Sequence, residues 1–482
     1  MKIALALFVK NEIQDIAGWI SWHLALGVDK IFIYDDHSTD GTFEFLKIVS
    51  EVYNIELHRT NTQAIADFYY RQTTSYEEAC WKARGNYDWI MCLDGDEYVS
   101  LEKANSLSEF LEDFSDFNGV VLNWRFYGSS GRVLRPRIPA YEAYTAHCKP
   151  DFKDCEIGKV FIRPEDYTFT YENPHYFRLH DERYANAVGH PVPSPINTKD
   201  IVWAGACVNH YLVRSMEHYI DRIRKRYGSD LQNSTAYWDH FNRNEISGHE
   251  RPEIVEKANA ILARIREACL NHYLQNISGG RLLPYGNPAA AWYLTIRREG
   301  CHTLSLDASD ARAVLARPGM GDGTQPLSAA IYADSPWTVY LFNEKGGHIS
   351  SVPFRIKGDP VARTVFTYAL QKNDAVESWT LRAPRKQRYL AIAPLQEGGQ
   401  VSADSQGWGH HEQYRLVMKS YHPPMLSACP GSLENREDFF HYLRSNRDRM
   451  TCDDFMLAFS TLPETCRAEL TQEEHGRAIS WI

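Results

Sequence analysis

Residues 89–99 read Trp-Ile-Met-Cys-Leu-Asp-Gly-Asp-Glu-Tyr-Val, an apolar run that leads directly into two aspartates one residue apart. The run at 89–93 has no polar alternation, which predicts a strand covered on both faces, as in a parallel sheet flanked by helices. Ligands of such sheets collect at the carboxyl ends of the strands, so Asp94 and Asp96 are expected at a functional site. Gly95 is expected to let the backbone turn sharply between them.

Two carboxylates at such a place suit Mg²⁺ or Mn²⁺, which share the rest of their coordination shell with waters and with the phosphates of a substrate. An Asp-x-Asp triplet is also common in ordinary surface turns. The neighbouring segments therefore decide between the two interpretations.

The preceding segments alternate between predicted strands and predicted helices. Strands are expected at 3–9, 30–34 and 55–58, and helices at 13–26, 42–49 and 65–84. This order is typical of βαβ units with parallel strands. Asn11 is a candidate N-cap of the first helix, and Gly27 is expected to end it.

The segments after Asp96 continue the pattern with a helix through 107–111 and a strand at 120–124. The following stretch at 126–131, Phe-Tyr-Gly-Ser-Ser-Gly, is rich in glycine. Such a loop can bind a phosphate or an acceptor through its backbone N–H groups, or it can be an ordinary tight turn.

Composition limits the class of protein. The 482 residues are enough for two or three domains. The net charge of −10 argues against a general nucleic-acid binder. The ten cysteines form no CxxC pair, which favours reduced thiols in a cytosolic chain. No apolar run reaches about 18 residues, so no membrane-spanning helix is expected.

Three regions are predicted. Residues 1–278 form the α/β domain, and 279–425 contain short alternating segments typical of an antiparallel sandwich or barrel. Residues 426–482 are expected to be helical. Exposed aromatics and the stretch Gly-Trp-Gly-His-His at 407–411 would allow the β-rich domain to bind glycan, although it can equally serve only in packing or dimerisation.

Several motifs follow one another in the first half. They are Phe8-Val9-Lys10-Asn11-Glu12, a Trp-rich helix ending in Gly27-Val28-Asp29, Tyr34-Asp35-Asp36-His37-Ser38 with Asp40, Leu93-Asp94-Gly95-Asp96-Glu97, Phe126 to Gly131, Lys159 to Pro164, Asn173-Pro174-His175 and Asn209-His210-Tyr211 with Arg214, Ser215 and Glu217. Taken in order, these motifs resemble the family 2 glycosyltransferases, and most closely the subgroup similar to glycosyltransferase family 92. The resemblance covers roughly residues 1–230, and it implies a GT-A fold of the Rossmann-like nucleotide-diphospho-sugar transferase type. It also implies a nucleotide-sugar donor, a divalent metal and inversion at the anomeric carbon.

The resemblance assigns roles to individual residues. Asp94 is expected to face the ribose and the metal, with Gly95 beside the nucleotide sugar, and Asp96 and His210 are expected to ligate Mn²⁺ or Mg²⁺. As a lone residue, His210 would more often be a buried core histidine. The nucleoside would be held by Phe8, Lys10, Asn11 and Asp36.

Asp36 matches the acid that accepts from the imide N–H of the base, which favours uridine and leaves guanosine and thymidine open. Arg222, on a predicted helix after His210, can pair with the diphosphate or belong to a solvated charged face. An inverting transfer also needs a general base. Glu142 lies where the family tends to place that base, Asp154 and Glu156 compete with it, and each can also be plain surface charge.

The sequence therefore predicts a metal-dependent inverting glycosyltransferase that uses a UDP-sugar and makes a bacterial-type polysaccharide. Two alternatives stay open: an inactive glycan-binding protein on a GT-A scaffold, and a nucleotidyltransferase. The acceptor would be a glycan, a lipid-linked compound or another hydroxyl compound. The expected location is the cytoplasm, with peripheral association at the inner face of the membrane also compatible with the sequence. No nucleic-acid partner is expected, and the sequence does not indicate the oligomeric state.

Overall fold

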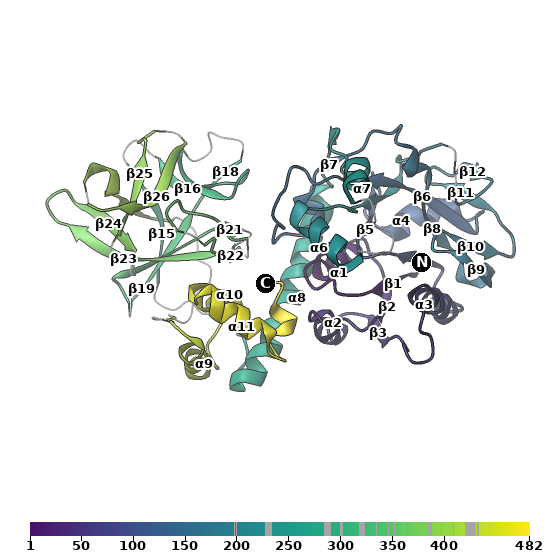
Figure 1. Ribbon diagram of the computed structural model, residues 1–482, viewed down its shortest axis with the longest axis horizontal. Helices are drawn as coiled ribbons and strands as arrows, with labels where there is room; N and C mark the ends of the chain where they lie inside the picture. The colour runs from purple at the N-terminus through teal and green to yellow at the C-terminus, as the bar shows by residue number, and fades with distance from the viewer. Residues whose placement is uncertain are drawn as a thin grey trace. The chain divides into compact units, whose positions relative to one another are not determined.

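The computed structural model describes residues 1–196, 198, 200–226, 234–283 and, in shorter runs separated by gaps, most of 291–482. The chain divides into two compact units, Met1–Cys269 with Arg477–Ile482 and Leu270–Gly476 (Figure 1). The first unit is mixed α/β, and the second is a β-rich antiparallel structure followed by helices, so the predicted fold class is confirmed. The three predicted domains with boundaries after residues 278 and 425 stay a prediction.

The first unit is built on a ten-stranded sheet with the order β12-β11-β6-β8-β4-β1-β2-β3 along its main path. Its parallel part contains β1 (Ile3–Val9), β2 (Lys30–Asp35), β3 (Ile55–Arg59) and β4 (Trp89–Leu93). Every residue of β1 and β4 is buried, as the uninterrupted apolar runs predict. In the register, Leu7 pairs with Leu93 and Phe8 with Tyr34, so these three strands end at one edge of the sheet.

The other part of the sheet is mixed. Strand β8 (Gly158–Ile162) runs antiparallel to both β4 and β6 (Gly119–Phe126). Strands β11 (Tyr184–Asn186) and β12 (Pro191–Val192) complete this edge.

A strand that sequence reasoning missed starts directly after Asp96. Strand β5 (Glu97–Leu101) pairs antiparallel with β13 (Ala206–His210), and β13 pairs parallel with β6. The register places His210 opposite Glu97. Two segments more than 100 residues apart in sequence are therefore joined beside the Asp-Gly-Asp turn.

Helices connect these strands (Figure 1). Helix α1 begins at Ile16, so the prediction of Asn11 as its N-cap is wrong; the N-cap residue is Asp15. Asn11 instead has a φ of 57° and accepts a hydrogen bond from the Thr39 N–H at 2.8 Å. The helices are α1 (Ile16–Ala25), α2 (Thr42–Ser50), α3 (Phe68–Ala83), α4 (Leu107–Leu111), α5 (Ala140–Ala143), α6 (Met216–Arg226), α7 (Ser234–Phe241) and α8 (Pro252–Ser278), and the boundary between the units falls within α8.

The second unit contains an antiparallel sheet whose order closes on itself, because β16 pairs with both β17 and β15. Buried aliphatic and aromatic side chains fill it, as the alternating pattern predicts. Its strands are β15 (Ala291–Arg297), β16 (Thr303–Asp307), β17 (Arg312–Ala316), β18 (Thr324–Pro326), β19 (Ser328–Tyr332), β20 (Thr338–Phe342), β23 (Val365–Asn373), β24 (Ser378–Ala383), β25 (Arg388–Ala393), β26 (Gly399–Ser405) and β27 (Arg415–Met418).

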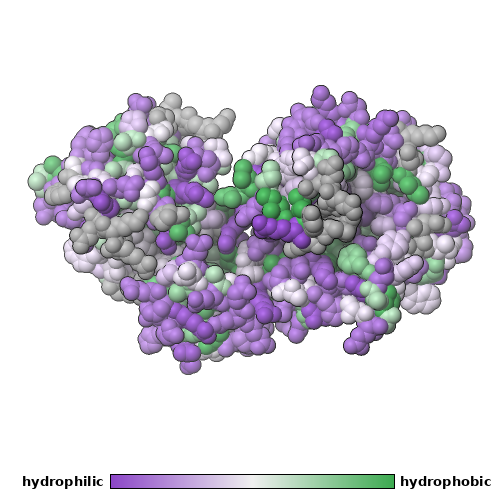
Figure 2. Space-filling model, in the orientation of Figure 1, coloured by the Kyte–Doolittle hydropathy of each residue, from purple (hydrophilic) through white to green (hydrophobic). Residues whose placement is uncertain are grey.

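Helices α9 (Arg436–Ser445), α10 (Cys452–Thr461) and α11 (Glu464–Gln472) follow in the second unit. Trp408 of the candidate glycan-binding stretch lies outside the described residues. Hydrophilic residues cover most of the visible face of each unit (Figure 2). Within the part of the chain that the structure describes, every helix is too short or too polar to cross a bilayer.

Candidate active site

The Asp94-Gly95-Asp96 turn joins β4 to β5 at the carboxyl end of the parallel strands. The buried indole of Trp19, on α1, donates to the backbone oxygens of Asp94 at 3.1 Å and Glu97 at 2.9 Å, so the helix fixes the turn from one side. Gly95 has no left-handed φ, and an added Cβ would come no nearer than 3.7 Å to Glu12. The chain turns here as expected, but this turn does not depend on the conformational freedom of glycine.

Asp94 is paired with a buried lysine. The Nζ of Lys159, a fully buried residue of β8, lies 3.0 Å from Asp94 Oδ2 and 3.2 Å from Glu97 Oε2. Burial is the largest influence and opposes ionisation of Asp94, but the charge and the hydrogen bond of Lys159 act together to keep the pKa of Asp94 below its usual value. Glu97 also accepts from the Asp94 N–H at 2.9 Å and from the Trp124 indole at 2.8 Å.

Asp96 faces an imidazole and a guanidinium. Its Oδ1 lies 3.6 Å from His210 Nε2, and its Oδ2 lies 3.5 Å from Arg222 Nη1. Burial again opposes ionisation, but the charges of His210, Arg222 and Arg214 hold the pKa of Asp96 far below its usual value. The structure thus brings the predicted residues Asp96, His210 and Arg222 together.

His210 is held by aromatic rings. Its ring centroid lies 4.7 Å from that of Trp124 and 4.9 Å from that of Phe126. Its buried Nδ1 has no hydrogen-bond partner among the described residues, so packing rather than hydrogen bonding to that nitrogen orients the ring. Nε2 is the nitrogen that points to Asp96.

The predicted metal ligands fit a divalent cation in part. Within the described ranges, no group of three or more His, Cys, Asp or Glu side chains is arranged to hold a metal ion. Asp94 is directed to Lys159, whereas Asp96 Oδ1 and His210 Nε2 face one another at 3.6 Å. That pair fits two ligands of one Mn²⁺ or Mg²⁺ whose other positions are taken by waters and phosphate oxygens.

Arg214 ties the turn to the start of α1. This buried residue has a φ of 53°, and its guanidinium reaches Asp15 Oδ2 at 2.5 Å, Glu12 Oε2 at 3.2 Å and the Gly95 oxygen at 3.2 Å. Burial, with the charges of Asp15 and Asp96, raises the pKa of Glu12 above its usual value. Sequence reasoning quoted Glu12 and Arg214 within motifs but did not predict their contact, since only the fold shows that they meet.

Asp36, the predicted base reader, already has four donors. Arg71 donates to Oδ1 at 2.6 Å and to Oδ2 at 2.8 Å, Thr60 donates to Oδ1 at 2.6 Å, and Lys10 donates to Oδ2 at 3.3 Å. A carboxylate has about four acceptor positions, so a base N–H would compete with one of these donors. Sequence reasoning missed Arg71, because a single arginine in a helix gives no sign of its partner.

Acid is expected to weaken the ion pair between Asp36 and Arg71. Burial raises the pKa of Asp36, but the hydrogen bonds from Arg71 and Thr60 lower it. The net effect is a fall in this pKa from 3.8 to about 2. The pKa of Asp36 is lower in the folded chain than in the unfolded chain. The contribution of its ion pair to stability is therefore complete above about pH 4 and is lost as the pH falls towards 2. At neutral pH, Asp36→Asn is expected to cost about 1–3 kcal/mol in urea unfolding.

The cost of Asp36→Asn should shrink below pH 4, where the wild type itself becomes protonated. Asp116→Asn, at an exposed aspartate, serves as the control. An equal difference between wild type and Asp36→Asn at pH 6 and pH 2.5 would contradict the assignment.

Phe8 lies at the same edge of the sheet and is almost fully buried. Its ring packs edge-on against that of Phe68, which is half exposed, at a centroid distance of 5.1 Å. Tyr69 and Tyr70 follow it as exposed aromatics at the start of α3. These three rings were also missed, because aromatics in a helix sequence are usually core residues.

The two candidate bases have different surroundings. Glu142, on α5, accepts from the Asn259 amide of α8 at 2.9 Å. Asp154 Oδ2 lies at hydrogen-bond distance, 2.9 Å, from His240 Nε2. The His240 ring packs on Phe152, and the Phe152 ring packs on Phe126, which is one of the rings that surround His210. Both roles stay predictions.

The glycine-rich loop 126–131 is a tight turn with engaged N–H groups. Gly128 N–H donates to the Ala146 oxygen, and those of Ser129 and Ser130 donate to the side chains of Asn242 and Asn244. These contacts favour the turn interpretation over phosphate binding.

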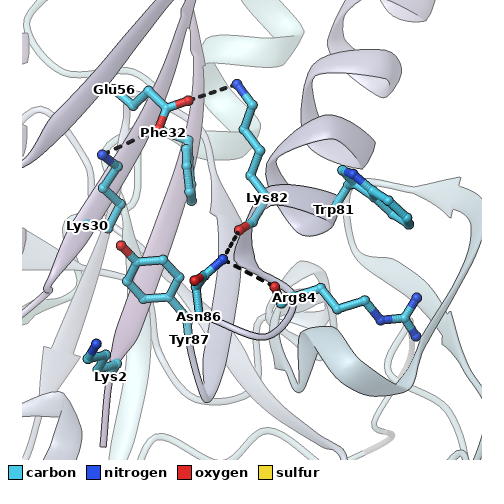
Figure 3. A pocket seen from close by; sticks show the side chains of 9 residues that line it. All are labelled: Lys2, Lys30, Phe32, Glu56, Trp81, Lys82, Arg84, Asn86 and Tyr87. Carbon is cyan, nitrogen blue, oxygen red and sulfur yellow. Dashed lines mark hydrogen bonds and ion pairs between the residues drawn. The ribbon is translucent and has the colours of Figure 1, made fainter.

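A cavity of about 650 Å³ lies at the opposite, amino end of β1 and β2 (Figure 3). Within it, Lys30 and Lys82 both point to the single carboxylate of Glu56, at 3.4 and 2.8 Å. It is therefore separate from the Asp94–Asp96 turn. Its lining is Lys2, Lys30, Phe32, Glu56, Trp81, Lys82, Arg84, Asn86 and Tyr87.

Comparison with solved structures found TarS of S. aureus, with a TM-score of 0.25, 10% identity and coverage of 87% of this chain and 96% of that one. It also found the glucosyl-3-phosphoglycerate synthase of Mycobacterium tuberculosis in complex with Mn²⁺, UDP and its product. That match has a TM-score of 0.21 and 18% identity, and it covers 35% of this chain and 58% of the synthase. With TM-scores this low, the fold assignment rests on the strand order of the chain itself.

Sequence relatives give a clearer result. A glycosyltransferase family 92 protein of Arabidopsis thaliana is 26% identical over 238 residues, which cover 47% of this chain and 37% of the relative. One of Ricinus communis is 24% identical over 242 residues, which cover 48% of this chain and 40% of the relative. The chain thus spans about two fifths of the length of these curated relatives. The sequence model of glycosyltransferase family 92 matches residues 3–262, more than half of the 482 residues, and the chain therefore belongs to glycosyltransferase family 92.

Proposed function

We propose that the chain is a metal-dependent, inverting glycosyltransferase of the GT-A type that moves a sugar from a nucleotide-diphosphate donor, with UDP-sugars favoured, to an acceptor hydroxyl. The observation that carries the proposal is the meeting of Asp96, His210 and Arg222 at the carboxyl end of the parallel strands. Membership of family 92 supports glycosyl transfer as the reaction class.

The reaction breaks the bond between the anomeric carbon and a phosphate oxygen, and negative charge builds on the leaving diphosphate. A bound Mn²⁺ or Mg²⁺ supplies positive charge at that diphosphate, and Asp96 and His210 are the residues that would hold it. Arg222, whose Nη1 lies 3.5 Å from Asp96 Oδ2, would offer its guanidinium to a phosphate oxygen. Lys159 keeps Asp94 ionised and fixed beside the turn.

The nucleoside would lie over the ends of β1 and β2, between Lys10, Asn11 and the half-exposed Phe68. Transfer with inversion needs a base for the acceptor proton, and Glu142 and Asp154 are the candidates. Asp154 gains support from its imidazole partner His240 and from its position next to the rings around His210. A glycan, a lipid-linked compound or another hydroxyl compound would be the acceptor, with polysaccharide synthesis at the cytoplasmic side of a membrane as the setting.

Nucleotide binding is expected to depend on the metal. In thermal-shift measurements with UDP, GDP and dTDP, UDP with Mn²⁺ should raise the melting temperature most, since a ligand at 100 times its Kd stabilises the native state by about 2.7 kcal/mol. EDTA should remove the shift. His210→Gln should lose the Mn²⁺-dependent part, whereas His190→Gln, at an exposed histidine, should keep it.

The product released from a nucleotide sugar separates the rival functions. Free nucleoside diphosphate is expected for glycosyl transfer. Pyrophosphate would instead indicate a nucleotidyltransferase, and the absence of any nucleotide shift would favour a glycan-binding protein.

A further inference from the structure

Two buried cysteines face one another beside the candidate active site. The Sγ atoms of Cys148 and Cys155 are 3.4 Å apart, and both residues are fully buried. A disulfide has an S–S distance of about 2.05 Å, so a movement of about 1.4 Å would bring the sulfurs to bonding distance. The composition alone suggested only scattered, reduced thiols.

The backbone on both sides of the pair is anchored to β6. The Cys148 N–H donates to the Phe126 oxygen at 2.9 Å, and the Cys155 oxygen accepts from the side-chain amide of Asn123 at 2.9 Å. Between them, the Phe152 ring packs on Phe126 at 5.6 Å. The contact between the thiols is therefore set by two separate attachments to one strand.

The segment of residues 148–155 also borders the candidate active site. Phe126 touches the ring of His210 at a centroid distance of 4.9 Å, and the segment carries Asp154, which is bound to His240. A bond between Cys148 and Cys155 would thus fasten the segment that carries Asp154 and that packs, through Phe152, on the Phe126 ring beside His210.

We propose that Cys148 and Cys155 are a reversible disulfide site that, when oxidised, fastens residues 148–155 against β6. The oxidant is a low-molecular-weight disulfide such as oxidised glutathione. The Cys148 thiolate attacks one of its sulfurs, forming a mixed disulfide and releasing one thiolate. The Cys155 thiolate then displaces the second, so that two protein thiols lose two electrons and two protons, and the oxidant becomes two thiols.

The surroundings support this order of attack. The hydrogen bond between the two sulfurs lowers the pKa of the Cys148 thiol and raises the pKa of the Cys155 thiol, which favours Cys148 as the thiolate that starts the exchange. Lys149, Pro150 and Asp151 are exposed, so the segment lies at the surface. Local opening of a surface segment admits a small oxidant to thiols that are buried on average.

The test is a peptide map of the full chain. The protein is equilibrated with oxidised and reduced glutathione at several ratios, its remaining thiols are alkylated in denaturant, and the digest is analysed without reduction. The expected result is a linked peptide pair containing Cys148 and Cys155, with an intact mass lower by about 2 Da. The oxidised chain should melt about 5 °C higher than the reduced one, because the bond restricts the unfolded chain.

Cys148→Ser and Cys155→Ser should each abolish both the linked peptide and the difference in melting temperature. Cys466→Ser, at a half-exposed cysteine of α11, is the control and should keep both. The proposal is overturned if Cys148 and Cys155 are alkylated in the oxidised wild type, or if either is linked to another cysteine, such as the buried Cys207. The map of the wild type decides this even if a serine variant fails to fold.

Discussion

Asp96→Asn is expected to lower kcat of sugar transfer by about 10²–10³-fold with little change in fold. Asparagine keeps the shape of the side chain but removes the charge that faces His210 and Arg222 at 3.6 and 3.5 Å. A neutral amide is a poorer ligand for a divalent cation, so the charge of the leaving diphosphate would lose its main stabiliser. Steady-state assays with saturating donor and Mn²⁺ measure the effect.

A second measurement distinguishes weaker binding of the metal from a slower transfer step. Titration of Mn²⁺ followed by electron paramagnetic resonance should show weaker binding by Asp96→Asn, in the absence of any donor. Asp116→Asn, at an exposed aspartate of the same unit, should bind Mn²⁺ and transfer sugar like the wild type. Full activity of Asp96→Asn would remove the metal from the proposed mechanism.

Lys159→Met is expected to reduce the free energy of unfolding by about 3–5 kcal/mol. Lys159 is fully buried and is the cation between Asp94 and Glu97, at 3.0 and 3.2 Å. Methionine fills much of the same space but leaves the fully buried carboxylate of Glu97 without its cation. Urea unfolding followed by tryptophan fluorescence, with Trp19 and Trp124 hydrogen-bonded to this region, measures the loss.

Removal of the Glu97 charge as well tests whether an unpaired buried carboxylate causes the loss of stability. The double variant Lys159→Met with Glu97→Gln should recover part of the stability, since one buried charge is then absent. Lys82→Met, at a partly exposed lysine paired with Glu56 and Glu78, should cost about 1 kcal/mol or less. A loss below about 1 kcal/mol for Lys159→Met, or no recovery in the double variant, would show that the charge on Lys159 is not what stabilises this part of the sheet.

Local pattern was sufficient to predict the parallel strands. The runs 3–9 and 89–93 are apolar without interruption, and both are buried strands in which all residues are covered. Strand β5 was missed because its sequence, Glu-Tyr-Val-Ser-Leu, begins with an acid that reads as part of the preceding turn. The burial of Glu97 is compensated by Lys159, by the Trp124 indole and by the Asp94 N–H.

The sequence predicted the acidic residues of the candidate site better than the basic residues that pair with them. Asp94 and Asp96 stand together in the sequence, and their position at the end of an apolar strand identified them. Lys159, Arg71 and Arg214 each come from a distant segment, and their partners follow from strand order and helix placement rather than from any local spacing. In the second unit, alternation predicted individual strands but not the pairing of β16 with β15 that closes the sheet.

The antiparallel pairing of β5 with β13 has a consequence for how this chain can vary. His210 reaches Asp96 because it stands opposite Glu97 in the ladder. Insertions in the exposed connections between residues 102 and 205 would leave that ladder unchanged, so this chain is expected to tolerate added length there. A single residue added inside β13 would turn the imidazole to the other face of the sheet, and its effect would resemble deletion of the histidine.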